Sequence, residues 1–415
     1  MTKKNLIFCG ISHLSLNYGA TAAKFKNDVI FFDFENKIND YLNNKILIEE
    51  PHLKKYLNKY KKKISFSSKL PHNLKSSIIF IAIDINTSKN NISSYNYINK
   101  IIKYIKNNVS NKNVPLVIMS QVNPGFTESI NWPKKYLFYQ VETLIFGKAI
   151  ERATNPERII VGTFDGNKVL NKLYLKYLDN FKTVKIFMRY QEAELTKMFI
   201  NSFLVSDLIL TNLLSSFCKK LNLDWDNPKK ALKLDKRIGK YAYLNPGLGI
   251  SGGNLERDIE NLNKINQKLK INSQLFNVFK NESIKQKSWI KNIILKYKKN
   301  KIINKETKIG MIGISYKMGT NSIKNSPSLI AIENLKKYKI FCSDELLFNK
   351  KIKKYSLTWK KSDEIINSCD ILFIFHSSKN LLKKLLINKN IKLLVDPYKI
   401  IDKKNNKFKF EIENL

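Results

Sequence analysis

The residues best suited to chemistry in this 415-residue sequence lie on one expected helix. Glu194, Lys197 and Asn201 are spaced i, i+3 and i+7, so they share one helix face. A lysine ammonium held near a reacting oxygen stabilises developing negative charge, and an asparagine adds a neutral donor. The same spacing is common on solvated helix faces, so the pattern needs support from the rest of the chain.

A glycine-rich stretch, Asn245–Asp258, is the second candidate. Five of its fourteen residues are Gly or Pro, in a chain with only 14 Gly and 10 Pro in all. Glycine permits positive φ and close approach of the backbone, so the whole stretch is expected to be a loop and neither a helix nor a strand. It ends in the opposite charges of Arg257 and Asp258, and a carboxylate there can take up a proton.

The third candidate is a turn near the start of the chain. Gly10, Ser12 and Ser15 occupy the glycine positions of a G-x-G-x-x-G dinucleotide fingerprint, and an acid, Asp33, follows about 20 residues later. Asp33 is suited to accept hydrogen bonds from ribose hydroxyls and to disfavour a 2′-phosphate, which favours NAD over NADP. The alternative is an ordinary strand–helix turn followed by a surface aspartate.

The elements that position these residues follow from apolar periodicity. Short apolar runs predict strands at Asn5–Cys9, Val29–Phe32, Ser77–Ile83, Pro115–Met119, Lys308–Ile312, Ile371–Phe375 and Ile391–Val395. Helical spacing predicts helices over Leu14–Lys26, Tyr95–Ile105, Glu192–Leu221 and Ile259–Tyr297. Alternating strands and helices indicate an α/β fold with parallel sheets.

We expect two Rossmann-like, doubly wound domains joined by a long central helix and a helical region. The predicted boundaries are 1–188, 189–297 and 298–415, with the Lys/Asn-rich stretch Lys298–Lys305 as the linker before the last domain.

The charge balance is strongly basic, with a formal net charge of +40. Almost all of this charge is lysine scattered along the chain, which indicates solvated faces more than a nucleic-acid site. We therefore expect no nucleic-acid partner and rank a basic nucleic-acid binder last among the possible functions. A basic surface still attracts anionic nucleotides.

Cysteine and histidine are sparse and dispersed. The four cysteines (Cys9, Cys218, Cys342, Cys369) and four histidines form no metal-ligand spacing and no disulfide framework, so we expect no metal. No apolar run approaches 18 residues, so no membrane span is expected. A reducing cytoplasm is the expected location.

The glycine-rich stretch resembles the active-site loop of the UDP-glucose/GDP-mannose dehydrogenase family, roughly G-P-G-x-G-F-G-G-S-C-F-P-K-D. Other segments resemble that family in the same order: Glu49–Leu53 (E-P-G-L), Ser120–Gly125 (S-T-V-P-x-G), Tyr139–Gly147 (Y-N-P-E-F-L-x-E-G), Asn155–Arg158 (N-P-x-R), Glu194–Asn201 (E-x-x-K-x-x-x-N), Asp235–Gly239 (D-x-R-I-G), Gly313–Pro327 (G-L-A-F-K-x-x-T-D-D-x-R-x-S-P) and Asp396–Tyr398 (D-x-R). The agreement covers nearly the whole chain.

The resemblance implies NAD as cofactor, a nucleotide-sugar substrate and a cytoplasmic homodimer that serves surface polysaccharide precursor synthesis. It implies three sets of site residues: catalytic Lys197, Asn201, Asp258, Glu142 and Asn254; cofactor-binding Gly10, Ser12, Leu14, Asp33, Ser120 and Lys324; and substrate-binding Tyr243, Arg237, Gly249, Gly252 and Lys317. The family uses the arginine at 237 to reach the sugar nucleotide in a neighbouring subunit, and the glutamate at 142 as a base on water. The implied domains are, in order, NAD-binding, central and dimerising, and nucleotide-sugar-binding.

The chain departs from the family at the nucleophile. The family oxidises a sugar primary alcohol twice and holds the aldehyde on a cysteine, and that cysteine falls on Asn254. Asparagine is not nucleophilic and cannot form a thioester. We expect an NAD-dependent dehydrogenase that performs one oxidation, or a second through the aldehyde hydrate, with Asp258 as the base and Lys197 as the electrostatic stabiliser. The alternative is a non-catalytic relative that binds a nucleotide sugar as a sensor or partner subunit.

Overall fold

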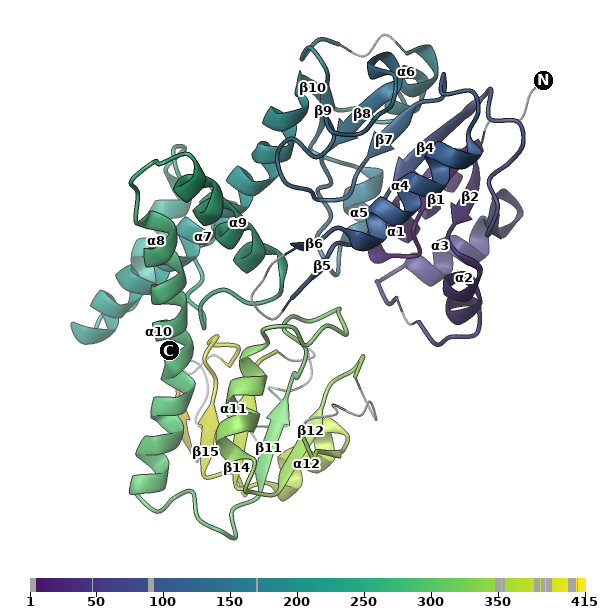
Figure 1. Ribbon diagram of the computed structural model, residues 1–415. Helices are drawn as coiled ribbons and strands as arrows, with labels where there is room; N and C mark the ends of the chain where they lie inside the picture. Colours follow the sequence, from purple (N-terminus) through teal and green to yellow (C-terminus); the bar gives the residue numbers. More distant parts are fainter. Residues whose placement is uncertain are drawn as a thin grey trace. The chain divides into compact units, whose positions relative to one another are not determined.

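Figure 1 shows a computed structural model of the protein, which describes residues 5–46, 48–88, 93–168, 171–347, 352, 355–376, 381, 385, 390–401, 408 and 410–415. The chain divides into two compact units, Met1–Ile200 and Asn201–Leu415. This division does not test the three predicted domain boundaries, which remain predictions.

The first unit is built on a sheet of eight described strands in the order β10-β9-β8-β7-β4-β1-β2-β3. The strands are β1 (Asn5–Cys9), β2 (Asp28–Phe32), β3 (Ile64–Ser67), β4 (Ser77–Ile81), β7 (Leu116–Ile118), β8 (Leu137–Gln140), β9 (Arg158–Thr163) and β10 (Val184–Arg189). Neighbouring strands pair in parallel except β8 and β9, which are antiparallel. A separate antiparallel pair joins β5 (Asn86–Thr87) to β6 (Ser93–Ser94).

Successive side chains of the central strands point to opposite sides of the sheet, and both sides are apolar. Helices therefore cover both faces of this sheet. Phe8 of β1 stacks on Phe80 of β4 at 4.7 Å between ring centroids, in the core that contains α1 and α6. Ile7 and Ile79 pack in the other core, against α4. The helices are α1 (His13–Lys24), α2 (Glu35–Leu42), α3 (Leu53–Lys59), α4 (Asn96–Asn108), α5 (Ala149–Thr154) and α6 (Lys172–Leu178), with the short 3-10 turns η1 (Lys61–Lys63) and η2 (Lys134–Tyr136).

A 31-residue helix, α7 (Tyr190–Lys220), follows β10 directly and runs from the first unit into the second. It contains no Gly or Pro, so nothing in its sequence interrupts the helical hydrogen bonds. Large apolar side chains of α7 are exposed from Phe203 onward, among them Phe203 (74%), Leu210 (55%) and Phe217 (54%).

By length and composition, α7 is the one helix in the described part of the chain that is apolar enough to cross a membrane. The mean hydropathy of its most apolar window is 1.4, and 28% of that window is buried. The expectation of no membrane span rested on the length of uninterrupted apolar runs, and it stays a prediction. The criterion is weak evidence for a span, because helices that pack against protein also satisfy it, and α7 carries the buried polar side chains of Lys197, Asn201 and Asn212.

After α7, the second unit contains α8 (Asp226–Leu234), α9 (Asn254–Lys268) and α10 (Leu275–Lys299), followed by a sheet of six described strands in the order β13-β12-β11-β14-β15-β16. Its strands are β11 (Ile309–Ile312), β12 (Ile340–Ser343), β13 (Thr358–Trp359), β14 (Ile371–Ile374), β15 (Leu393–Val395) and β16 (Glu411–Glu413), and each pair is parallel. The core on one face holds α10 and α11 (Pro327–Leu335), as Figure 1 shows, and that on the other face holds α12 (Ser362–Ser368).

The predicted α/β class with two Rossmann-like sheets joined by a long helix is confirmed. Three local predictions were wrong. β9 runs antiparallel to β8, α10 continues through Lys299 into the expected linker, and the glycine-rich stretch ends at Gly253 because α9 begins at Asn254.

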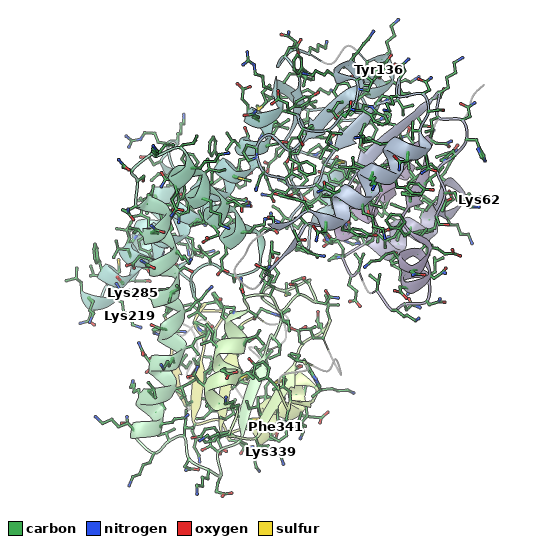
Figure 2. All side chains as sticks on the ribbon, viewed as in Figure 1. Lys62, Tyr136, Lys219, Lys285, Lys339 and Phe341 are labelled. Atoms are coloured by element: carbon green, nitrogen blue, oxygen red, sulfur yellow. The ribbon has the colours of Figure 1, made fainter. Side chains whose placement is uncertain are left out.

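Lysine side chains are exposed on separate elements of the fold. Figure 2 labels Lys62 in η1, Lys285 in α10 and Lys339 before β12, and all three are exposed. This distribution matches the expectation of scattered positive charge.

Candidate active site

The turn after β1 has the geometry of a dinucleotide-binding turn. Gly10 adopts φ +100°, and its N–H donates to the carbonyl of Phe32 at the end of β2 (2.8 Å). A Cβ at this position would lie 2.5 Å from the side chain of Ile83, so only glycine fits. The two serines that replace fingerprint glycines turn inward: Ser12 caps α1 through the Ser15 N–H (3.1 Å) and donates to the Ala82 carbonyl (2.6 Å). The serine hydroxyls therefore cap α1, and the His13 N–H at the same helix end donates to Asp84 (2.9 Å).

Asp33 lies directly after β2 and is fully buried. Its Oδ2 accepts a hydrogen bond from the Ile11 N–H (2.6 Å), and its Oδ1 accepts from the Phe34 N–H (2.7 Å) and the Tyr97 hydroxyl. Burial and the adjacent Asp33 carboxylate raise the pKa of Tyr97, so the phenol stays a donor. A carboxylate accepts about four hydrogen bonds, so these three donors leave about one position on Asp33.

Leu14 and Ser120 also lie at this edge of the first sheet. Leu14 is buried in the first turn of α1. Ser120 follows β7, accepts from the Ile83 N–H (2.8 Å) and donates to the Ile81 carbonyl (3.2 Å). Its hydroxyl therefore holds the ends of β4 and β7 together, and a contact with cofactor remains a prediction.

A buried His13–Glu50 pair supports the same turn and was not anticipated from the sequence. His13 Nε2 lies 2.8 Å from Glu50, which also accepts from the N–H groups of Gly147 (3.1 Å) and Ala149 (2.9 Å). Phe146 packs on the His13 ring, with centroids 4.2 Å apart. The motif around Glu50 was visible in the sequence, but its partner lies 37 residues away.

Lys197 and Glu142 form an ion pair inside the first unit. The ammonium of Lys197 lies 2.9 Å from Glu142 Oε1, and the two side chains are 11% and 13% exposed. Glu142 also accepts from the Leu144 N–H (3.0 Å). Both residues were predicted site residues, and the structure brings them together.

Glu194 has a different role from its helix neighbour. Its two oxygens accept from the N–H groups of Gly125 (2.6 Å) and Thr127 (2.9 Å), which fixes the turn after β7 to α7. Burial raises the pKa of Glu194, against the lowering effect of these hydrogen bonds. The first residue of the predicted helix face is therefore a positioning residue for the loop.

Asp258 is the centre of a buried polar cluster in the second unit. It is fully buried, and it accepts hydrogen bonds from the Asn201 amide and from Arg257 Nε (3.1 Å). Arg257 itself is only 4% exposed. The cluster thus joins α7 to the amino-terminal part of α9, and Asn254 is the first residue of that helix.

The glycines before α9 are required by packing within the second unit. Gly249 (φ +73°) abuts Ser283 of α10, where a Cβ would lie 2.7 Å from the carbonyl oxygen. Gly252 (φ +80°) abuts the ring of Tyr316, where a Cβ would lie 2.9 Å away. The sequence predicted that the backbone of this loop comes close to another group. At Gly249 and Gly252 that group is another residue of the same chain.

The segment Gly313–Pro327 packs on this glycine loop. Asn325 donates to the Gly252 carbonyl (3.0 Å) and to Glu256. The side chain of Lys324 lies against Gly253, and burial followed by the charge of Arg257 lowers the pKa of Lys324. Lys317 is exposed in the same segment. Ser326 occupies the expected N-cap position of α11, but its hydroxyl donates to the Ile314 carbonyl (2.8 Å) and does not cap the helix.

Arg237 and Tyr243 lie on the surface of the second unit. The Arg237 side chain is 89% exposed and makes two hydrogen bonds to Asp235, at 2.6 and 3.0 Å. Tyr243 is 43% exposed, and its backbone carbonyl accepts from Thr211 of α7 (2.9 Å). A guanidinium held in this exposed position is available to another molecule.

Two features limit alternative chemistry. Among the described residues, no group of three His, Cys, Asp or Glu side chains could hold a metal ion. The four cysteines are free thiols.

Comparison with known proteins places this geometry in a family. Residues 4–178 match the NAD binding domain of the UDP-glucose/GDP-mannose dehydrogenase family, and residues 191–282 match the central domain of the same family. The fold and these matches define an NAD-binding α/β oxidoreductase. The chain belongs to the UDP-glucose/GDP-mannose dehydrogenase family, as the sequence motifs predicted.

The UDP-glucose 6-dehydrogenase of Rickettsia bellii (strain RML369-C) is 29% identical over 343 residues, covering 80% of this chain and 78% of that protein. The UDP-glucose 6-dehydrogenase of Campylobacter jejuni subsp. jejuni is 27% identical over 342 residues, covering 80% and 84%. The structure of a UDP-glucose dehydrogenase from Pyrobaculum islandicum superposes with a TM-score of 0.82 at 18% identity, over 99% of this chain and 97% of that chain. The similarity to the Pyrobaculum islandicum structure shows that the two proteins share a fold.

Proposed function

We propose that this protein oxidises the primary alcohol of a UDP-glucose-like nucleotide sugar, with NAD as the electron acceptor, and releases the aldehyde or its hydrate. The buried cluster of Asp258, Asn201 and Arg257 carries the proposal. Burying a charged pair without a functional return is costly, because well-packed apolar residues are often at least as stabilising. The product would serve surface polysaccharide precursor synthesis.

Each polar group has a role in this reaction. Asp258 accepts the alcohol proton, and Asn201 fixes one side of its carboxylate. Lys197 stabilises the charge that develops on the sugar oxygen, and Glu142 holds the ammonium in place. If the aldehyde hydrate is oxidised further, Glu142 is the group that activates water.

The residues of the first unit fit NAD. The positive φ of Gly10 and the buried Asp33 supply the turn and the ribose acceptor of a dinucleotide fold, while Asp84 accepts from the His13 N–H at the amino end of α1 (2.9 Å). When bound, NAD supplies the two-electron acceptor. Ser12, Leu14, Ser120 and Lys324 are proposed as further cofactor contacts, and Tyr243, Arg237, Gly249, Gly252 and Lys317 as substrate contacts.

No other thiol replaces the missing nucleophile at position 254. Burial raises the pKa of Cys342 to about 12 and that of Cys369 to about 11, and burial followed by the charge of Asp33 also raises the pKa of Cys9. Cys218 lies 17 residues beyond Asn201 on α7, a rise of about 25 Å along the helix. A thioester intermediate is therefore not part of the proposal.

A panel of nucleotide sugars incubated with NAD tests this function. The rate is read as NADH absorbance, and the product is identified by mass spectrometry after trapping with hydroxylamine, which captures an aldehyde. One NADH per trapped sugar supports the proposal. Two NADH and a uronic acid would show that the hydrate route continues to the acid.

A second candidate is a nucleotide-sugar-binding protein without turnover. Two observations favour it: Asn254 stands where a nucleophile is expected, and the Tyr398 ring packs against Gly247 where the resembling motif has arginine. Binding of a nucleotide sugar by calorimetry, with no NAD reduction across the panel, would select this candidate.

We further propose a homodimer formed through the exposed apolar face of α7, which carries Phe203, Leu210 and Phe217. Exposed apolar side chains at helical spacing indicate a protein interface. Arg237 is proposed to complete the active site of the neighbouring subunit. Light scattering of the wild type should give the dimer mass, and Phe203→Asp should shift it toward the monomer.

A further inference from the structure

The N–H groups at the turn after β1 donate to side-chain oxygen atoms of the protein. The Ile11 N–H donates to Asp33 Oδ2 (2.6 Å). The Ser12 N–H donates to the Ser15 hydroxyl (3.1 Å), and the Ser15 N–H donates to the Ser12 hydroxyl (3.1 Å). In a dinucleotide fold, the phosphates of the cofactor bind at this turn and at the helix start that follows it. A phosphate that binds here therefore competes with oxygen atoms of the chain itself.

Asp84 is the carboxylate at the start of α1. The His13 N–H, in the first turn of the helix, donates to Asp84 Oδ2 at 2.9 Å. Asp84 comes three residues after Ile81, the last residue of β4, and β4 lies next to β1 in the sheet. A negative charge at the amino end of a helix interacts favourably with the helix dipole, whether it belongs to a carboxylate or to a phosphate. Asp84 thus uses a donor that suits a cofactor phosphate.

A serine in the place of a fingerprint glycine holds the Asp84 segment against this turn. Ser12 Oγ donates to the carbonyl of Ala82, two residues before Asp84 (2.6 Å). The Ala82 N–H in turn donates to the Cys9 carbonyl at the end of β1 (3.1 Å). A glycine at position 12 has no hydroxyl and cannot make the first of these bonds. The departure from the fingerprint and the position of Asp84 are therefore connected.

The acceptors at this turn differ in how easily a ligand displaces them. Asp33 is fully buried, and Ser12 and Ser15 are 7% and 0% exposed and bond to each other. Asp84 is exposed. Its carboxylate can turn into water, where hydration compensates the hydrogen bond that it loses. Asp84 is therefore the acceptor that an incoming phosphate displaces at the lowest cost.

We propose that Asp84 is a displaceable blocking group, which occupies the phosphate position at the start of α1 in the free protein and leaves it when NAD binds. The inference rests on the proposed use of NAD at this turn. A dinucleotide offsets the displacement of Asp84, because its ribose also binds, at Asp33. Inorganic phosphate has no such second contact, so Asp84 excludes it more strongly than it excludes NAD.

Selectivity against small anions has a physical reason in a chain of this charge. The formal net charge of +40 attracts anions of every kind to the surface. An unblocked helix amino end would bind inorganic phosphate as well as the phosphates of a cofactor. A carboxylate that must first be displaced reserves this position for a ligand with a second anchor.

The alternative role of Asp84 is to stabilise α1 alone. An acid at the amino end stabilises a helix through the same dipole interaction. This structural role predicts that Asp84→Asn lowers the thermal stability and leaves the affinity for NAD unchanged. The blocking role predicts that the same substitution tightens NAD binding.

Calorimetric titration of the full-length protein with NAD at about pH 8, where an aspartate is ionised, separates the two roles. Asp84→Asn removes the charge with little change of size, and Asp84→Ala also removes the acceptor. Both variants should bind NAD at least fivefold more tightly than the wild type. Asp179→Asn is the matched control, because Asp179 is a 73% exposed carboxylate at the end of α6 and its loss changes the net charge equally. This control should leave the affinity unchanged, and thermal unfolding shows that each variant is folded.

Two further ligands test whether the effect belongs to phosphate. Adenosine, which has no phosphate, should bind the wild type and Asp84→Asn equally. Inorganic phosphate should compete with NAD at a concentration at least fivefold lower in Asp84→Asn than in the wild type.

Three results would overturn the proposal: NAD affinity that is unchanged or weaker in both Asp84 variants, adenosine affinity that rises as much as NAD affinity, or no NAD binding by any of the folded proteins. These titrations contain no sugar. A protein that binds NAD as expected but oxidises no nucleotide sugar would therefore count against the proposed function and not against the blocking role of Asp84.

Discussion

Lys197 and Glu142 allow the catalytic and structural roles of a buried charge to be separated. Their charged atoms lie 2.9 Å apart, and both side chains are nearly buried. Lys197→Met leaves Glu142 buried without its cation. Breaking such a pair from one side costs about 3–5 kcal/mol when burial is complete, and the residual exposure here puts the expected loss near the lower end. Loss of an electrostatic stabiliser of a developing oxyanion lowers kcat by about 10²–10³-fold.

The double substitution Lys197→Met/Glu142→Gln removes both charges and so repairs the structural fault. We expect the free energy of unfolding of the double variant to return to within about 1 kcal/mol of the wild type, because no buried charge remains unpaired. The kcat should remain as low as in Lys197→Met. Glu142→Gln alone should lose some stability and lower the rate of the first oxidation less than Lys197→Met does, because the ammonium stays and only the carboxylate that holds it is lost.

The assay pairs urea unfolding of each variant with initial rates of NADH formation at saturating nucleotide sugar. Recovery of both stability and kcat in the double variant would show that Lys197 acts only through packing. A kcat within threefold of the wild type in Lys197→Met would remove Lys197 from the chemistry altogether.

Three further predictions follow from the proposed site. Asn254→Cys places a thiol at the first residue of α9, where the helix amino end favours a thiolate. The yield should therefore rise toward two NADH per sugar. An unchanged product in a folded variant would contradict the assignment of the nucleophile to position 254. Tyr97→Phe removes one hydrogen-bond donor from Asp33, so titration should show NAD binding several-fold more tightly. Asp33→Ala should weaken NAD binding and reduce the preference of the protein for NAD over NADP. A weaker or unchanged NAD affinity in Tyr97→Phe would refute competition between the Tyr97 hydroxyl and the cofactor for Asp33. Mixing Arg237→Ala protein with Lys197→Met protein should restore about one quarter of wild-type activity, because half of the dimers are mixed and each mixed dimer has one intact site. No recovery despite subunit exchange would place Arg237 in the active site of its own subunit.

The fold was predictable because the central strands of both sheets, such as β4, β11 and β14, are buried on two faces. Continuous apolar runs such as Asn5–Cys9 mark such strands, and glycine marks the turn after Asn5–Cys9 and after Lys308–Ile312. The direction of β9 was not predictable, because antiparallel pairing with β8 depends on how the chain returns to the sheet and leaves no periodic signal. The start of α9 was missed because glycine content was read across the whole stretch, although Gly253 is only the N-cap residue.

The candidate site was predictable only one residue at a time. Helical spacing placed Glu194, Lys197 and Asn201 on one face, but spacing does not specify what each side chain meets. In the structure Glu194 holds the loop at Gly125, and Lys197 meets Glu142, 55 residues earlier in the chain. The Tyr97–Asp33 contact joins residues 64 apart and had no signal in the sequence.

The proposed loss of the nucleophile and the presence of the buried charged groups can be weighed against each other in physical terms. Under the proposed assignment of position 254 to the nucleophile, Asn254 removes one step, the capture of the aldehyde, and leaves the first oxidation chemically complete. A protein that only bound a nucleotide sugar would gain nothing from a fully buried carboxylate held by Asn201 and Arg257, since apolar packing would join α7 to α9 at no greater cost. A buried carboxylate with fixed donors is instead what proton transfer requires, because its orientation is set before the substrate arrives. For this reason we propose an enzyme that performs the first oxidation, in preference to a protein that only binds a nucleotide sugar.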